Sequence, residues 1–225
     1  MRAAFFDLDG TLVKGYASVN FVDYMSKKGS MDRNLFFEIM ETIKLYKSGK
    51  LSYLKTVSKI TKTVAKSFKG LRKDFVVQES ISFVKTLDYF SYTKNILNKF
   101  NGMKKFFISA SPSENVSAVA NYLGINDFSA NIHEIKSGKY TGKITLDLTK
   151  KGEKRKAIIK LSNKFSVDLS KSYAFGDTEN DLEFLELVGT PVAVSPNDAL
   201  LKAAQERGWL IMNENNYKNV MSCLI

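Results

Sequence analysis

Residues 5–13 read FFDLDGTLV, an apolar run that ends in two carboxylates two positions apart. A short apolar run bounded by turn residues is typical of a buried strand, and the Gly-Thr pair that follows indicates a turn. Because residues two apart on a strand point the same way, Asp7 and Asp9 are expected to enter one pocket at the strand's carboxyl end. Two carboxylates this close repel each other unless a cation or a shared proton compensates. The stretch therefore predicts a Mg²⁺ site, since this ion prefers oxygen ligands.

Three further segments favour such a site over the alternative of an exposed acidic turn. Residues 106–111 (FFISAS) end a second apolar run in a hydroxyl residue, and residues 172–177 (SYAFGD) end a third in an aspartate. Between them, residues 151–156 (KGEKRK) place lysines at the start of a predicted helix. Open α/β sheets bind ligands outside the carboxyl ends of their strands. We therefore expect the first pair of aspartates, the hydroxyl residue, a lysine and the second pair of aspartates to converge in one crevice.

In this order the motifs resemble those of the haloacid dehalogenase (HAD) superfamily, and within it the phosphoserine phosphatase-like branch, subfamily IB. They are residues 7–11 (DLDGT), Ser109, a lysine near position 154, and residues 176–181 (GDTEND). The resemblance covers the whole core and includes the later segment 189–197 (GTPVAVSPN). It implies an α/β fold with a Rossmann-like, doubly wound parallel sheet. It also implies a Mg²⁺-dependent phosphohydrolase that works through an aspartyl-phosphate intermediate.

The residue types suit this chemistry. An aspartate can act as the nucleophile on phosphorus and split one difficult step into two, and Asp7 is the first polar group beyond the strand. Asp9 is the predicted general acid and base. We expect Mg²⁺ to be bound by the Asp7 carboxylate, the Asp9 backbone carbonyl and the Asp177 carboxylate. Ser109 is expected to donate a hydrogen bond to a phosphoryl oxygen.

Two lysines are candidates for the cation beside the phosphoryl group. Lys154 lies 23 residues before Asp177, the offset that the family pattern implies, and it puts the following apolar residues on one helix face. Lys156 is closer to Asp177 and lies on a different face. We favour Lys154 and leave Lys156 open. Asp181 is expected to orient that lysine or a metal-bound water.

The substrate is less well defined than the reaction. Five residues are predicted to contact it: Thr11, Ser109, Ala110, Asn180 and Tyr16. Phosphoserine-specific members of the family place a glutamate shortly after the first motif and an arginine on the cap. Tyr16 and Ile60 stand at the corresponding positions here, and neither can neutralise a zwitterion. Lys59 or Lys62 is an alternative to the arginine. We therefore expect a small phosphorylated metabolite and leave phosphoserine itself open.

The catalytic core is expected to be discontinuous. Residues 14–95 place apolar residues at helical spacing, and no proline occurs before residue 112. Three N-caps are predicted in this segment: Ser18, Asp32 and Ser52. We predict a helical cap, a C1-type insertion, over residues 14–95 and a core of residues 1–13 and 96–225, in which strands and helices alternate. Inserted directly after the catalytic loop, the cap is interpreted as a lid that excludes water, rather than as a helical decoration.

The composition narrows the chemistry. One histidine, His133, and one cysteine, Cys223, leave too few candidates for Ser-His, Cys-His or His-rich zinc sites. His133 follows a predicted strand and is expected to be a surface or hairpin residue. No stretch approaches the roughly 18 apolar residues of a membrane span, and no signal-peptide pattern precedes Asp7. We therefore expect a cytoplasmic enzyme.

Most of the positive charge lies in the predicted cap. Residues 14–94 carry 16 Lys or Arg and 7 Asp or Glu, which is +9 of the net +11 of the chain. Such a surface is expected to steer small anionic phosphate esters. It shows no nucleic-acid recognition motif, so no specific nucleic-acid partner is predicted. Two other functions stay open: a membrane-associated lipid-phosphate phosphatase, through contact with anionic lipid, and a non-catalytic phosphate-binding regulatory protein.

Overall fold

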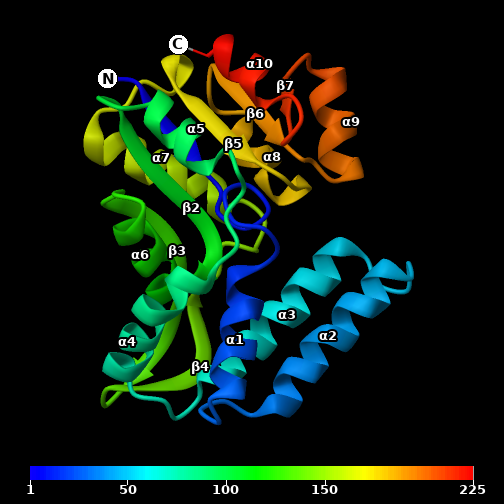
Figure 1. Cartoon of the computed structure of the whole chain (residues 1–225), viewed down its shortest axis with the longest axis vertical. Coiled ribbons are helices and arrows are strands. Elements are labelled where there is room, and N and C mark those ends of the chain that lie inside the picture. The colour runs from blue at the N-terminus through cyan, green and yellow to red at the C-terminus, as the bar shows by residue number, and fades with distance from the viewer. Residues whose placement is uncertain (225) are drawn as a thin grey trace.

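The computed structural model describes residues 1–224, and its centre is a seven-stranded sheet in the order β4-β3-β2-β1-β5-β6-β7 (Figure 1). The strands are β1 (Ala3–Phe6), β2 (Lys104–Pro112), β3 (Asp127–Lys136), β4 (Lys139–Leu146), β5 (Tyr173–Gly176), β6 (Thr190–Val194) and β7 (Leu210–Met212). Neighbouring strands pair in parallel, except that β3 and β4 form an antiparallel pair. The predicted α/β fold with a doubly wound parallel sheet is confirmed.

The helices fall into two groups. Those that flank the sheet are α5 (Thr93–Lys99), α6 (Ser113–Tyr122), α7 (Glu153–Phe165), α8 (Leu182–Leu185), α9 (Asp198–Glu206) and α10 (Tyr217–Ser222), with short 3-10 turns at Leu169–Lys171 and Glu179–Asp181. Between β1 and β2 the chain forms α1 (Ala17–Lys27), α2 (Arg33–Lys47), α3 (Tyr53–Phe68) and α4 (Lys73–Phe83), followed by the turn Val84–Thr86. We call α1–α4 the cap helices. Within residues 1–224, none of the helices is both long enough and apolar enough to cross a bilayer.

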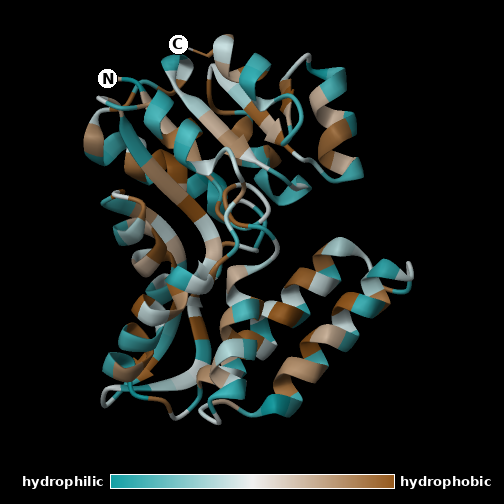
Figure 2. Ribbon diagram, viewed as in Figure 1, coloured by the Kyte–Doolittle hydropathy of each residue, from teal (hydrophilic) through white to brown (hydrophobic). Residues whose placement is uncertain are grey.

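The central strands β1 and β5 are buried on both faces, which explains why their sequences lack charged residues. Adjacent residues of β1 point to opposite sides: Phe6 stacks on Phe175 with ring centroids 4.8 Å apart, and Phe5 stacks on Phe106 at 4.9 Å. Helices α5, α6 and α10 pack on the Phe6 face, and α7, α8 and α9 pack on the Phe5 face. Figure 2 shows brown along the middle of β2, and brown alternating with teal on the helices.

The strand order creates a crevice at the carboxyl end of β1. This strand lies between β2 and β5, and the chain leaves it towards β2 on one side before it returns to β5 on the other. Loops that diverge in this way leave a space at the switch point. Asp7 follows β1 and Asp177 follows β5, so both lie at this point.

The cap helices pack around aromatic side chains and stand beside the crevice. Helices α2 and α3 form a hairpin that projects from the rest of the molecule (Figure 1). Phe21 of α1 contacts Phe68 of α3 and Phe83 of α4, with ring centroids 5.7 Å and 5.2 Å apart. These buried aromatic contacts join the hairpin to α1 and α4, and each contributes beyond its buried area.

Helix starts in this segment follow the predictions only in part. Asp32 caps α2, because its carboxylate accepts a hydrogen bond from the Asn34 N–H. Ser52 stands at the N-cap of α3 without a capping hydrogen bond from its side chain. The prediction that Ser18 caps α1 is wrong. The helix begins at Ala17, since the Ala17 N–H is already bound by the Asp9 carboxylate at 2.6 Å.

His133 is buried, and the prediction of a surface position is wrong. Only 4% of the residue is exposed, because α3 of the cap covers the β3–β4 hairpin. The ring lies edge-on to Phe68, 5.0 Å away, and to Tyr140, 6.3 Å away. Burial lowers the pKa of His133 to about 4, because the charged imidazolium loses its hydration.

This burial makes folding sensitive to pH. Because the folded-state pKa of His133 lies below the ordinary value of 6.5, its contribution to stability is complete above pH 6.5 and is lost as the pH falls towards 4. Between pH 7.5 and 5 we expect the loss to be about 2 kcal/mol. Urea unfolding of the wild type and of His133→Gln at both pH values measures this loss. Both proteins contain the same carboxylates, so the contribution of these groups to the pH dependence cancels in the difference between the two free energies of unfolding. Parallel pH profiles would contradict the prediction.

Candidate active site

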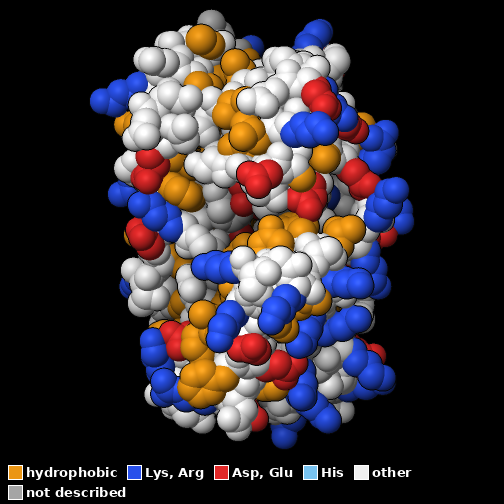
Figure 3. All heavy atoms as spheres, turned by 90° about the vertical axis from the view of Figure 1, so that its right-hand side faces the viewer, with side chains coloured by type: hydrophobic (Ala, Val, Ile, Leu, Met, Phe, Trp, Pro, Cys, Tyr) orange, Lys and Arg blue, Asp and Glu red, His pale blue; other side chains and the backbone are white. Residues whose placement is uncertain are grey.

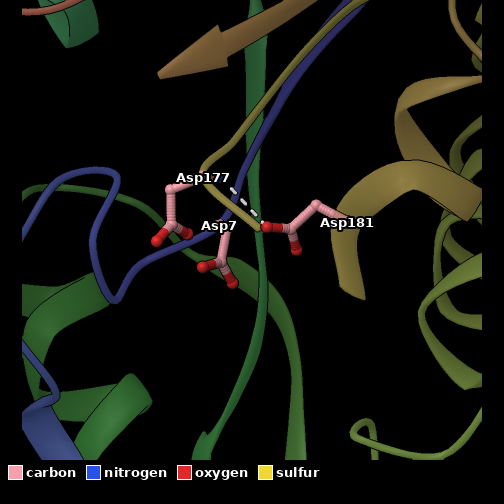
Figure 4. Close-up of side chains that lie close together, drawn as sticks. All are labelled: Asp7, Asp177 and Asp181. Carbon is pink, nitrogen blue, oxygen red and sulfur yellow. Dashed lines mark hydrogen bonds between the residues drawn. The ribbon is translucent and has the colours of Figure 1, made fainter. Parts of the chain in front are cut away.

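Three aspartates from two loops converge at the crevice (Figure 4). Asp7 is 5% exposed, and its N–H donates to the Phe175 carbonyl at 2.8 Å, which continues the β1–β5 pairing. Oxygens of Asp7, Asp177 and Asp181 lie within 4.8 Å of one another. Three carboxylates this close require compensating positive charge.

Both carboxylate oxygens of Asp181 accept hydrogen bonds, one from the loop after β5 and one from Lys154. One of its oxygens accepts hydrogen bonds from the backbone N–H groups of Asp177 and Thr178, both at 3.0 Å. The other oxygen accepts from Lys154 Nζ at 2.5 Å. Asp181 is fully buried. The carboxylates of Asp7 and Asp177 are therefore the pair whose oxygens are best placed to bind a cation.

The structure separates the two candidate lysines. Lys154 is buried, and its Nζ donates to Asp7 at 2.8 Å as well as to Asp181. Lys156 points to solvent with 73% of its side chain exposed, where it pairs with Glu153 at 2.7 Å. Lys154 therefore supplies the positive charge beside Asp7, and it reaches there from the first turn of α7.

The electrostatics of the site follow from burial. Burial raises the pKa of Asp7 to about 7, raises that of Asp177 well above its ordinary value and also raises that of Asp9. Burial alone would lower the pKa of Lys154, but the charges of Asp181 and Asp7 outweigh it and raise that pKa. Lys154 therefore stays charged, but its single ammonium group does not balance the negative charge of the clustered carboxylates. A divalent cation at Asp7 and Asp177 would supply what is missing.

Two glycines allow the loops to approach each other. Gly10 has φ +75°, a conformation that favours glycine, and a Cβ there would lie 2.0 Å from an Asp177 carboxylate oxygen. A Cβ on Gly176 would lie 2.6 Å from the Cβ of Asp181. The DLDG and GD segments therefore need glycine for steric reasons, because any side chain would displace an aspartate of the site.

Asp9 is held differently from Asp7. One oxygen accepts from the Ala17 N–H, and the other accepts from the Ser111 hydroxyl at 2.6 Å. Its carboxylate thus joins β2 of the core to the first turn of α1. No role was predicted for Ser111 from the sequence. It lies two residues after Ser109 on an extended strand, so its side chain is on the same face of the sheet.

These groups form the floor of a cavity of about 360 Å³ between the core and the cap helices. The predicted residues that line it are Asp7, Asp9, Tyr16, Ala110, Lys154, Asp177 and Asn180. The other three, Thr11, Ser109 and Asp181, are fully buried behind the wall. The Thr11 hydroxyl lies 3.4 Å from Asp177, and the Ser109 hydroxyl accepts from the Ser111 N–H at 3.1 Å.

The cap helices line one side of this cavity. Tyr53 of α3 donates from its hydroxyl to the Thr178 hydroxyl at 2.9 Å, a direct bond between a cap helix and the loop that carries Asp177 and Asp181. Asn180, in the same loop, lies 3.5 Å from the Leu148 carbonyl. Figure 3 shows the side of the molecule that lies on the right in Figure 1. Acidic side chains stand at the middle of this side, and many Lys or Arg side chains lie over its lower half.

The comparisons with known proteins agree with this geometry. The family model described as haloacid dehalogenase-like hydrolase matches residues 4–186. Over 224 residues the chain is 29% identical to phosphoserine phosphatase SerB1 of Mycobacterium tuberculosis strain H37Rv, covering 93% of this chain and 70% of that protein.

Solved structures share the fold. A Bordetella pertussis protein of unknown function matches with a TM-score of 0.79 and 21% identity, covering 95% of this chain and 98% of that one. A phosphoserine phosphatase that holds a phospho-aspartyl intermediate analogue matches with a TM-score of 0.67 and 20% identity, covering 95% and 93%. Because the family model spans most of the chain, including the loops after β1 and β5, the protein belongs to the haloacid dehalogenase-like hydrolases and is a phosphatase of the phosphoserine phosphatase-like type.

Proposed function

We propose that the protein is a Mg²⁺-dependent phosphomonoester hydrolase that acts on a small phosphorylated metabolite through an aspartyl-phosphate at Asp7. The observation that carries the proposal is the place of the Asp7 carboxylate at the cavity floor, in contact with Lys154 and close to Asp177. A nucleophile, a fixed cation and a second carboxylate at one point are the groups that phosphoryl transfer needs.

In the first step a carboxylate oxygen of Asp7 attacks phosphorus, and the bond from phosphorus to the ester oxygen breaks. Asp9 gives its proton to the leaving oxygen, a role for which the raised pKa of its carboxyl suits it. In the second step water attacks the phosphorus of the aspartyl-phosphate and passes a proton to Asp9. Inorganic phosphate leaves, and both carboxyl groups are restored.

The other residues position these groups. Lys154 balances charge on the phosphoryl oxygens, while Asp181 holds the lysine in place. Mg²⁺, for which the hard oxygen donors of Asp7 and Asp177 are suited, would neutralise charge on the transferred group. The Ser109 hydroxyl and the backbone at Ala110 are proposed to contact the phosphoryl group. We also propose residues 14–95 as a lid that admits the ester and then excludes water.

Mg²⁺ binding can be tested apart from turnover. Saturating Mg²⁺ is expected to raise the Tm of the wild type by about 5–10 °C, because a ligand at 100 times its Kd stabilises the folded state by about 2.7 kcal/mol. Asp177→Asn should lose most of this shift, together with the Mg²⁺-dependent hydrolysis of p-nitrophenyl phosphate. Asp198→Asn, an exposed position on α9, serves as the matched control and should keep both. Equal shifts in all three proteins, or hydrolysis that persists in EDTA, would refute the metal site.

A further inference from the structure

We propose that the cavity takes phosphate monoesters whose leaving group is uncharged and mainly apolar or aromatic, rather than a phosphorylated amino acid. This inference rests on the proposed function and adds to it the chemical class of the alcohol. It comes from the contrast between the two walls of one cavity, the charged wall of the core and the mainly apolar and aromatic wall of the cap.

The cap helices and the loop before them supply mostly apolar and aromatic side chains to the lining. The apolar residues are Val19, Met40, Ile43, Val57 and Ile60, and the aromatic residues are Tyr16, Tyr46 and Tyr53. Apart from Lys47, the polar residues on this side carry no charge; they are Ser18, Asn20, Thr56 and Thr61. A leaving group that extends from the phosphoryl site into this wall would bury carbon against carbon.

Charged groups are nearly confined to the opposite wall. Within residues 1–224, Lys47 is the one charged residue that the cap contributes to the lining, and it lies exposed. The cap contributes no carboxylate among those residues, so an ammonium group on the substrate would lose its hydration without an ionic partner. Of the core carboxylates, Asp7 contacts Lys154, Asp9 accepts two hydrogen bonds, and Asp177 belongs to the proposed Mg²⁺ site.

The three tyrosines make this wall aromatic rather than polar. The Tyr53 hydroxyl donates to Thr178, so its ring is the part left to face a ligand. The ring of Tyr46 lies edge-on to that of Tyr53, with centroids 6.1 Å apart. Tyr16 also lines the cavity, with 45% of the residue exposed, and a phenol hydroxyl is uncharged near neutral pH. Flat apolar surfaces of this kind favour aliphatic and aromatic ligands.

A series of n-alkyl phosphates tests the inference on the wild-type protein with Mg²⁺. Ethyl, butyl and hexyl phosphate keep a similar ester bond and differ in the apolar surface that they can bury. We expect kcat/KM to rise roughly two- to fourfold for each methylene that enters the cavity, and O-phosphoserine to lie at least about tenfold below butyl phosphate, which is similar in size.

A matched pair of variants places the effect in this wall. Ile60→Lys introduces a charge into the lining and should lower kcat/KM at least about tenfold more for hexyl than for ethyl phosphate. Leu54→Lys makes the same kind of change on the same helix, at a residue that is 64% exposed and outside the lining, and should leave the series unchanged. The wild-type series does not depend on either variant folding.

The outcomes distinguish this inference from the proposed function. If no ester is hydrolysed with Mg²⁺, including p-nitrophenyl phosphate, the proposed function itself fails. If p-nitrophenyl phosphate is hydrolysed but kcat/KM is flat across the alkyl series, or phosphoserine is preferred, the phosphatase assignment stands and the inference is overturned. A rise with chain length that Ile60→Lys abolishes and Leu54→Lys retains supports it.

Discussion

Asp7→Asn is expected to abolish turnover, with kcat lowered by at least about 10⁴-fold. Asparagine has nearly the same shape, and its amide oxygen can still accept the hydrogen bond from Lys154, but it lacks the anionic oxygen that attacks phosphorus. The free energy of unfolding should fall by no more than about 1 kcal/mol, because the substitution also removes one of three clustered carboxylates that repel one another.

Two measurements together decide this prediction. Steady-state hydrolysis of p-nitrophenyl phosphate gives the loss of turnover, and intact-mass analysis after a rapid acid quench detects the phosphorylated enzyme in the wild type. The variant should show neither turnover nor the added phosphoryl mass, while its urea midpoint stays close to that of the wild type. A phosphorylated form of Asp7→Asn would place the nucleophile elsewhere.

The geometry of the site was predictable from sequence because it depends on strand ends. Asp7 and Asp177 are 170 positions apart, yet each follows a strand of the parallel sheet, and the pairing of β1 with β5 brings both to the same edge. The i and i+2 spacing of Asp7 and Asp9 also placed both in one cavity. What spacing could not show is that the two carboxylates have different partners, one on α7 of the core and one on α1 of the cap.

Other features depend on contacts that only the folded chain defines. His133 has the local pattern of a hairpin residue, and its burial comes from α3, about 70 residues earlier in sequence. Helix α4 was not predicted, because its buried residues do not form a clear apolar stripe. The start of α1 was displaced by the Asp9 carboxylate, which outcompetes Ser18 as the partner of the helix N-terminus. For His133 and for the start of α1, a tertiary contact overrides a local signal.

Lys154→Met should be the most disruptive substitution for stability. It removes the ammonium group that Asp7 and Asp181 both contact, and breaking a buried ion pair by deleting one partner costs about 3–5 kcal/mol. The loss should be larger at pH 8 than at pH 6. The Asp7 carboxyl already has a pKa of about 7, and without the lysine its pKa rises further, so at pH 6 it binds a proton and the uncompensated charge is reduced.

We also expect Lys154→Met to lower kcat/KM by about 10³-fold. Urea unfolding at the two pH values measures the first effect, and p-nitrophenyl phosphate hydrolysis measures the second.

Lys156→Met is the control that the chain itself supplies, two residues along the same helix. The Lys156 side chain is 73% exposed and pairs with Glu153 at the surface, where such pairs contribute little. Its replacement should change the free energy of unfolding by less than about 0.5 kcal/mol and leave turnover within about twofold. If Lys156→Met lost activity while Lys154→Met kept it, the phosphoryl group would have to bind on the solvent side of α7. In that position it would be out of reach of Asp7, and the nucleophile, the lysine and the cavity could not belong to one reaction.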